Sequence, residues 1–158
     1  MGSRTPENPN CSKICCQSAI KNILRIRRLN PDARIFVLYR DMRTTGFQED
    51  YAIEARKLGA VFVQYEENAK PDVSTVGGKL IVSFEERVLG RRLEVECDCL
   101  ALSTGFVADE EGTEDLAAIF HLNRTADGFF LEDHVKLRPV ELSVPGFTVA
   151  GTAHGPKS

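Results

Sequence analysis

Apolar residues recur at helical spacing in the first part of the chain and then form short continuous runs. Residues 12–29 repeat apolar side chains every three or four positions, which predicts a helix that ends before Pro31. The continuous apolar run 33–39 predicts a strand covered on both faces, and a second helix over 48–58 leads to another buried strand at 60–64. Strand, helix and strand in quick succession predict a right-handed parallel crossover of the Rossmann type.

The middle of the chain predicts a loop followed by a hairpin. Residues 66–78 are polar and contain Pro71 and two consecutive glycines, and we expect a loop there. Alternating residues on both sides of a turn at Gly90 predict an antiparallel pair, 79–84 with 93–95.

Beyond this hairpin the pattern changes. One more apolar run, 100–103, predicts a last buried strand. An acidic stretch that begins at Asp109 predicts the start of a helix that extends to Phe120. The later apolar residues predict short strands, at Phe129-Phe130-Leu131, Val135 and Phe147 to Ala150. The expected fold is α/β, with a Rossmann-like parallel sheet, an antiparallel β extension, and a domain boundary at Gly105.

Composition narrows the function classes. The 158-residue chain carries a net charge of −3, so we expect no broad nucleic-acid-binding surface. No apolar run approaches the ~18 residues of a membrane span, and no signal-peptide-like segment is visible. We therefore expect a cytoplasmic protein, in a compartment where disulfides are rare. The abrupt ends at Met1 and Ser158 predict an excised fragment of a longer protein.

Three of the five cysteines, Cys11, Cys15 and Cys16, cluster at the start of the first predicted helix. Near a helix N-terminus the dipole favours the thiolate, which is the form that binds metal. Three such thiolates can hold one face of an iron–sulfur cluster, whereas structural zinc sites usually draw on two separated ligand pairs. A disulfide between the adjacent Cys15 and Cys16 would be strained. Cluster ligation, core packing and redox chemistry all stay open from the spacing alone.

The other two cysteines, Cys97 and Cys99, fall on one face of the strand run 94–102, and we expect them to pack as small hydrophobes. A nicotinamide-binding unit needs a Gly-x-Gly-x-x-Gly loop, and the cysteine cluster stands where that loop would be. Arg40 and Asp41 follow the strand that normally sets ribose selectivity. Without the glycine loop we interpret them as part of a solvated loop.

The tail carries the last candidate site. An apolar strand runs into a glycine-containing turn before Lys157, and backbone often approaches a ligand at such a turn. His154 in this turn can donate a proton near neutral pH, although a turn histidine is more often structural or exposed. The remaining histidines and nearby carboxylates form no recognisable catalytic set: His121, His134, Glu132 and Asp133.

Several motifs spread over nearly the whole chain are specific when taken together. They are Gly2-Ser3-Arg4, the Cys11/Cys15-Cys16 cluster, Tyr39-Arg40-Asp41-x-Arg43-Thr44-x-Gly46, Ser103-Thr104-Gly105, Asp127-Gly128-Phe129-Phe130-Leu131, His134-Val135-Lys136-Leu137-Arg138-Pro139 and Ala150-Gly151-x-Ala153-His154-Gly155-Pro156-Lys157. In these segments the chain resembles the A-type, iron–sulfur flavoprotein subunits of heterodisulfide reductase and their relatives. These relatives include the flavoprotein subunits of quinone-interacting oxidoreductase complexes.

The resemblance implies a thioredoxin-reductase-type flavoprotein combined with iron–sulfur modules. Residues 1–104 would form the nicotinamide-type Rossmann-like domain, and residues 105–158 would form the C-terminal portion of a truncated FAD-binding domain. In the family, the three clustered cysteines belong to a four-cysteine iron–sulfur motif whose first cysteine lies just before the Val-Gly-Ser-Arg segment. Here Met1 stands directly before Gly2, and that cysteine is missing.

The tail matches the last FAD-contact segment of such flavoproteins. This implies that Gly151, Thr152, Ala153 and Lys157 lie near the flavin and that His154 neighbours its ring. Thr152 stands where many members carry an aspartate, and the N-terminal glycine-rich FAD unit is absent. The implied cofactors are FAD and a [4Fe-4S] cluster in the intact protein, with neither fully bound in the fragment.

The resemblance therefore predicts an electron-transfer fragment of an FAD/iron–sulfur oxidoreductase that is inactive by itself. Its partners would be other subunits of a heterodisulfide-reductase-like or quinone-interacting complex, with a homo-oligomer possible. Two alternatives stay open. One is a non-catalytic, degenerate Rossmann docking module of such a complex, and the other is an NAD(P)H-dependent flavoprotein dehydrogenase, which the missing glycine loop disfavours.

Overall fold

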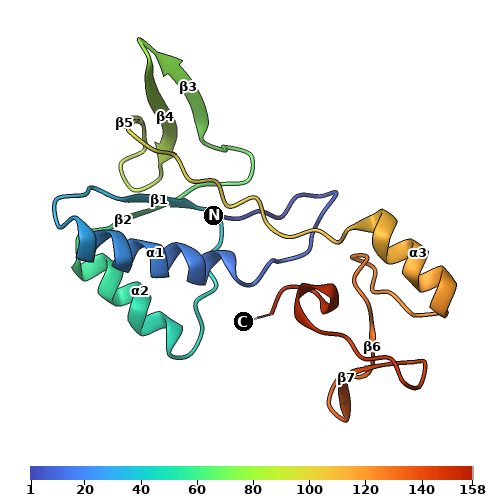
Figure 1. Cartoon of the computed structure of the whole chain (residues 1–158). Coiled ribbons are helices and arrows are strands. Elements are labelled where there is room, and N and C mark those ends of the chain that lie inside the picture. Colours follow the sequence, from blue (N-terminus) through green and yellow to red (C-terminus); the bar gives the residue numbers. More distant parts are fainter. Residues whose placement is uncertain (158) are drawn as a thin grey trace. The chain divides into compact units, whose positions relative to one another are not determined.

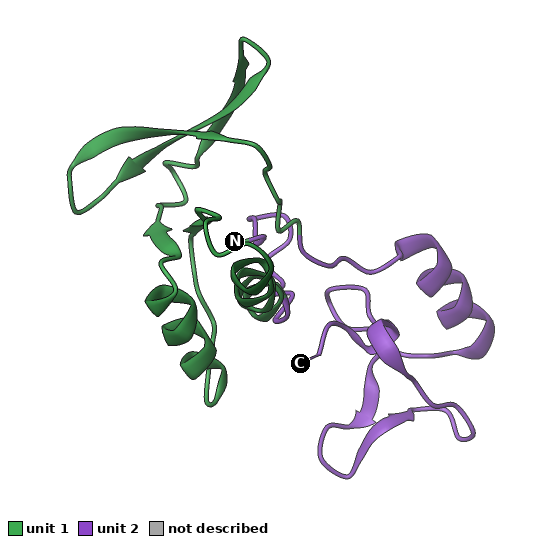
Figure 2. Cartoon of the chain, turned by 60° about the vertical axis from the view of Figure 1, so that its left-hand side comes forward, with its two compact units in different colours: residues 1–2, 15–104 green, residues 3–14, 105–158 purple. Residues whose placement is uncertain are grey.

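The computed structural model describes residues 1–157, which form a mixed α/β protein (Figure 1). The elements follow in the order α1 (Cys15–Leu29), β1 (Phe36–Tyr39), α2 (Gln48–Lys57), β2 (Val61–Gln64), β3 (Asp72–Val76), β4 (Lys79–Glu86), β5 (Arg91–Cys97), α3 (Glu110–Phe120), β6 (Glu132–His134), β7 (Arg138–Leu142) and the 3-10 turn η1 (Gly151–His154). The chain divides into two compact units (Figure 2): unit 1 holds residues 1–2 and 15–104, and unit 2 holds residues 3–14 and the chain from 105 onward. None of the described helices combines the length and the apolarity needed to cross a membrane.

Two parallel strands and two helices build the first core of unit 1. β1 pairs in parallel with β2, Phe36 opposite Val61, and α2 is the crossover between them. The predicted strand–helix–strand arrangement is therefore confirmed as a parallel pair. α1 buries Ile20, Ile23 and Leu24 in a cluster with α2 and β1, which is the face that the sequence pattern predicted.

A three-stranded antiparallel sheet in the order β3-β4-β5 completes unit 1. β4 and β5 pair from Leu80 opposite Cys97 to Glu86 opposite Arg91, which confirms the predicted hairpin. β3 lies where we expected a loop, so that expectation is wrong. The two glycines at 77–78 both have positive φ, which is what a two-residue type I′ hairpin turn between β3 and β4 requires.

The apolar run 100–103 forms no strand, contrary to the prediction. A strand needs a hydrogen-bonded neighbour, and the described residues supply none for this run, in which Leu102 is 73% exposed. β5 ends at Cys97, whose half-buried thiol packs against the cluster formed by Val63, Val82 and Phe84. Cys99 lies beyond the strand and is exposed, so the prediction of core packing holds for Cys97 and fails for Cys99.

Unit 2 is built from α3, the β6–β7 pair and η1. The predicted acidic helix is confirmed as α3. A small core of Phe130, Leu142 and Val149 holds the unit together. Of the predicted short strands, 129–131 and 147–150 contribute isolated bridges, and the regular pairing is formed by β6 and β7 instead.

Candidate functional site

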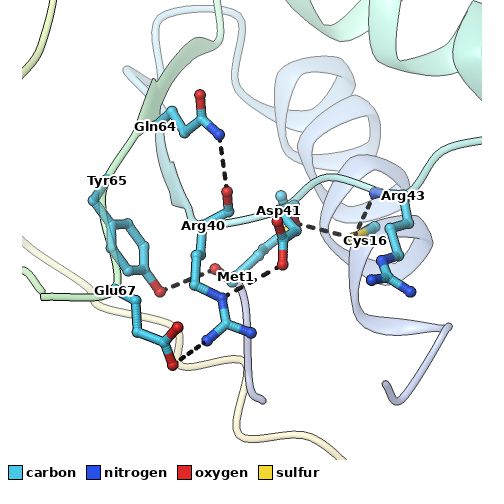
Figure 3. Close-up of polar contacts among 8 residues, drawn as sticks. All are labelled: Met1, Cys16, Arg40, Asp41, Arg43, Gln64, Tyr65 and Glu67. Carbon is cyan, nitrogen blue, oxygen red and sulfur yellow. Dashed lines mark hydrogen bonds and ion pairs between the residues drawn. The ribbon is translucent and has the colours of Figure 1, made fainter. Parts of the chain in front are cut away.

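The amino terminus of the chain lies against the carboxyl end of β1, within unit 1 (Figure 3). The Met1 amino group donates to the Leu38 carbonyl at 2.5 Å, and the Arg40 amide donates to the Met1 carbonyl at 3.0 Å. These bonds flank Tyr39, which is the pattern of a parallel ladder. A Cβ at Gly2 would lie 2.7 Å from the Arg40 Cβ, so glycine permits this close approach. In open α/β sheets, ligands bind at the carboxyl ends of parallel strands.

Arg40 forms two ion pairs at the carboxyl end of β1. Its side chain is 12% exposed and forms ion pairs with Asp41 at 3.4 Å and Glu67 at 3.0 Å. The Tyr65 hydroxyl donates to the Met1 carbonyl at 3.1 Å, and burial raises the pKa of that hydroxyl. The expectation of a solvated loop is therefore wrong for Arg40, because its side chain is largely buried and its guanidinium forms two ion pairs (Figure 3).

Cys15 and Cys16 open α1 beside the same edge. The Cys16 thiol is 4% exposed, accepts the Arg43 amide at 3.4 Å and donates to the Asp41 carbonyl at 3.9 Å (Figure 3). Burial lowers the pKa of the Met1 amino group, and the charges of Cys15 and Cys16 act on it in the opposite direction. The Cys16 thiol therefore contacts the loop after β1 within unit 1.

Cys11 lies in unit 2 and outside the helix. α1 begins at Cys15, because Lys13 has a φ of +60° that a right-handed helix excludes. The predicted helix start at residue 12 is therefore wrong, and Cys11 and Cys15 do not share a helix face. Within residues 1–157 no three Cys, His, Asp or Glu side chains gather into a metal-ligand set, and all five cysteines are thiols without a disulfide. Cluster ligation by the three cysteines stays a prediction.

Ser12 and Gly105 form a tight junction within unit 2. The Ser12 side chain is almost completely buried, and its hydroxyl oxygen accepts the Phe106 amide at 2.8 Å and lies 3.4 Å from the Ser3 hydroxyl oxygen. Gly105 has φ +88°, and a Cβ there would stand 2.7 Å from Ser3 and 2.9 Å from Ser12. Residues of the Gly-Ser-Arg, cysteine and Ser-Thr-Gly motifs thus share one packed site. Sequence reasoning missed this role of Ser12.

The tail residues predicted to face a flavin form η1 and the segment after it in unit 2. Residues 151–153 are exposed, and no atom lies within 4 Å of the place where a Cβ on Gly151 would be. The His154 side chain is 7% exposed, with its Nε2 2.5 Å from a Glu132 oxygen and its Nδ1 2.7 Å from the Lys157 ammonium. Residues 151–153 of η1 are therefore exposed, while the His154 ring is held in place.

The protonation pattern of this cluster follows from its donors. Lys157 can only donate, so His154 Nδ1 accepts and Nε2 carries the proton that points toward Glu132. That hydrogen bond is the main reason why the pKa of the Glu132 carboxyl lies below its ordinary value. We expected Glu132 to belong to no recognisable set, and the structure corrects this, because β6 and η1 bring Glu132 and His154 together.

Comparisons with known proteins bear on these motifs. No family model matches the chain. An A-type iron-sulfur subunit of the CoB–CoM heterodisulfide reductase of Methanopyrus kandleri is 36% identical over 99% of this chain and 24% of its own length. The A-type subunit of the H(2)/formate:CoB-CoM heterodisulfide,ferredoxin reductase of Methanococcus maripaludis is 35% identical, again over 99% of this chain. Its counterpart in the ferredoxin:CoB-CoM heterodisulfide reductase of Methanosarcina acetivorans is 34% identical over the same share.

The resemblance to the A-type subunits of heterodisulfide reductase is confirmed. The chain spans about a quarter of the length of the first two heterodisulfide reductase relatives and 20% of the third. The similarity covers nearly all of both units, so the cysteine segment, the junction around Gly105 and η1 all correspond to parts of these heterodisulfide reductase relatives.

Proposed function

We propose that this chain is an electron-transfer segment of an FAD/iron–sulfur oxidoreductase that passes electrons between a flavin and iron–sulfur clusters. The observation that carries the proposal is its similarity, over 99% of its length, to several proteins named as A-type subunits of heterodisulfide reductases. We further propose that residues 1–104 are the nicotinamide-type, Rossmann-like domain of such a flavoprotein, and that residues 105–158 belong to its FAD-binding domain.

In this proposal Cys11, Cys15 and Cys16 supply thiolate ligands to a [4Fe-4S] cluster, which carries single electrons when bound. The support is that Cys15 and Cys16 open α1 and that the Cys16 thiol contacts the loop after β1, at the Asp41 carbonyl and the Arg43 amide. In the family that the chain resembles, the fourth cysteine precedes the Gly-Ser-Arg segment, so it would approach the same two thiols. The Arg43 amide donates to the Cys16 sulfur, and hydrogen bonds to ligand sulfurs are one of the factors that set a cluster's potential.

The exposed residues of η1 are the proposed flavin contact, with Gly151, Thr152 and Ala153 facing the cofactor and Lys157 beside it. A flavin supplies one- or two-electron exchange when bound. His154 is proposed to neighbour the ring as a positioning residue, because both of its ring nitrogens already lie at hydrogen-bonding distance from protein groups. No side chain in the described part of the chain needs to act as a nucleophile, since the cofactors carry the chemistry.

For the whole protein we propose an oxidoreductase of the cytoplasm that works with other subunits of a heterodisulfide-reductase-like or quinone-interacting complex. The support for partner proteins is that these relatives are themselves named as subunits. The chain alone is proposed to be inactive, because it spans only about a quarter of those relatives.

One observation favours a second candidate, a docking module without electron transfer: within residues 1–157 no metal-ligand set is assembled. A reductive titration of the intact protein from its source separates the two. Electron transfer predicts flavin absorption and a cluster band that both bleach with dithionite. A protein that assembles with its partners but shows neither band would be a docking module. Rapid bleaching by NADH or NADPH alone would instead favour the nicotinamide-dependent dehydrogenase.

A further inference from the structure

Three polar side chains form a continuous series of contacts within unit 2: Glu132, His154 and Lys157. Glu132 lies on β6 opposite Leu142, which is buried in the core of the unit. The Glu132 carboxylate accepts the Nε2 proton of His154 at 2.5 Å, and His154 Nδ1 accepts from the Lys157 ammonium at 2.7 Å. The His154 side chain, which is only 7% exposed, therefore connects a carboxylate on β6 to a cation beyond η1.

The main chain fixes both ends of this series. The Phe130 amide donates to the Ala153 carbonyl at 3.1 Å, which ties the segment before β6 to η1. Residues 155–156 are buried, so the backbone is packed up to Lys157. The exposed Lys157 side chain keeps its own freedom, because a lysine ammonium sits on a flexible four-carbon stem. The hydrogen bond to His154 therefore restricts where this ammonium lies.

Glu132 determines which nitrogen of His154 can accept from Lys157. In a neutral imidazole one nitrogen donates and the other accepts, and the partner of the first sets the role of the second. The hydrogen bond from His154 lowers the pKa of the Glu132 carboxyl, and the Lys157 charge acts in the same direction. The carboxylate is therefore ionised at neutral pH and keeps the proton of the ring on Nε2. Glu132 thus acts on the Lys157 ammonium through the ring.

We propose that Glu132 is a positioning residue that, through His154, holds the Lys157 ammonium at the flavin contact of η1. This inference rests on the proposed function, in which residues 151–153 and Lys157 lie beside FAD. The ammonium suits that cofactor, because two-electron reduction at neutral pH leaves a flavin with a negative charge, which a fixed cation stabilises. Holding the ammonium in place should raise the reduction potential of the bound flavin, and releasing it should lower that potential.

The reduction potential of the flavin in the full-length protein tests the proposal. It is measured by reductive titration against a redox dye, at the flavin absorption band, with the iron–sulfur contribution recorded separately. Glu132→Ala should make the affinity for reduced relative to oxidised flavin about tenfold weaker, which lowers the potential of a two-electron couple by about 30 mV. Glu132→Gln keeps an oxygen that accepts the Nε2 proton and should not lower the potential. The matched control Asp133→Ala removes a carboxylate that pairs with Arg138 instead, and it should not lower the potential either.

The sign of the shift separates positioning from a plain effect of charge. Removing an anion by itself favours the negatively charged reduced flavin and so raises the potential, whereas releasing the Lys157 ammonium lowers it. Lys157→Ala should also lower the potential. Adding Glu132→Ala to that variant should lower the potential no further, because Glu132 acts through the ammonium that is already missing.

A second measurement needs no flavin. Acetic anhydride should acetylate Lys157 faster in Glu132→Ala than in the wild-type chain, as read by peptide mass spectrometry, with the exposed Lys70 of unit 1 as the internal reference. Equal acetylation in both chains, a potential that Glu132→Ala leaves unchanged or raises, or an equal lowering by Glu132→Gln would each overturn the positioning role and leave the proposed function intact. A wild-type full-length protein with no reducible flavin would overturn the proposed function, and this inference with it.

Discussion

Replacing Gly105 by alanine should destabilise unit 2 through two separable effects. Gly105 has φ +88°, and an added Cβ would lie 2.7 Å from Ser3 Oγ, 2.8 Å from Ser3 Cβ and 2.9 Å from Ser12 Oγ. The left-handed backbone costs an L-residue about 1–2 kcal/mol. Forcing a methyl group into a packed site costs about 1–3 kcal/mol more. We therefore expect Gly105→Ala to lower the free energy of unfolding of unit 2 by about 2–5 kcal/mol.

Gly146→Ala is the matched control in the same unit. Gly146 has φ +89°, and no atom lies within 4 Å of its added Cβ. It therefore carries the backbone effect without the contacts, and the difference between the two variants should be about 1–3 kcal/mol. Amide hydrogen exchange of the β6–β7 pair under native conditions, with urea unfolding as a second measure, reports the stability of unit 2.

A rescue variant identifies the atoms responsible. Ser3→Gly removes both Ser3 atoms that an alanine at position 105 would meet, so it should restore part of the stability that Gly105→Ala loses. A double-mutant cycle separates this recovery from the separate effect of Ser3→Gly. Equal destabilisation by Gly105→Ala and Gly146→Ala, or a cycle with no coupling, would refute the junction.

Other predictions concern single contacts. Tyr65→Phe removes the hydrogen bond to the Met1 carbonyl and should lower the free energy of unfolding of unit 1 by about 1 kcal/mol; an unchanged urea midpoint would contradict this. Folding lowers the pKa of Glu132, mainly through its hydrogen bond with His154. The ionised Glu132 therefore stabilises the folded protein fully above its ordinary pKa of 4.5, and this stabilisation is lost as the pH falls through the lower pKa of the folded state. The melting temperature should therefore fall in acid for the wild type, and it should fall less for Glu132→Gln. Under native conditions a maleimide should label the exposed Cys99 well before the buried Cys16, as read by peptide mass spectrometry, and the reverse order would show that the burial is misassigned.

The sequence pattern predicted those helices and strands in which buried side chains recur at regular spacing. The apolar face of α1 and the pair β1–β2 were found this way, because their side chains enter a continuous core. β3 was missed because every residue of Asp72–Val76 is exposed, so no hydrophobic alternation marks it. Its signal was the pair Gly77-Gly78, whose positive φ values suit a two-residue hairpin turn.

The candidate site was only partly visible in the sequence, for a physical reason. The cysteine segment stands out because its residues are neighbours in the chain. The hydrogen bonds around this segment join residues that are far apart in the sequence. Ser12 and Phe106 are 94 positions apart, and Met1 and Tyr65 are 64 positions apart. Such pairs follow from tertiary packing, and neither composition nor spacing signals them.

The central claim, that the cysteine segment ligates an iron–sulfur cluster, is tested most directly by anaerobic reconstitution with iron and sulfide. An added thiol such as dithiothreitol can complete the ligand set, and the readouts are bound iron and the visible charge-transfer band. We predict that both are lost or strongly reduced in Cys11→Ser, Cys15→Ser and Cys16→Ser. The matched controls Cys97→Ser and Cys99→Ser, outside the cluster segment, should retain them. Equal iron content and an equal band in all five variants would contradict the claim.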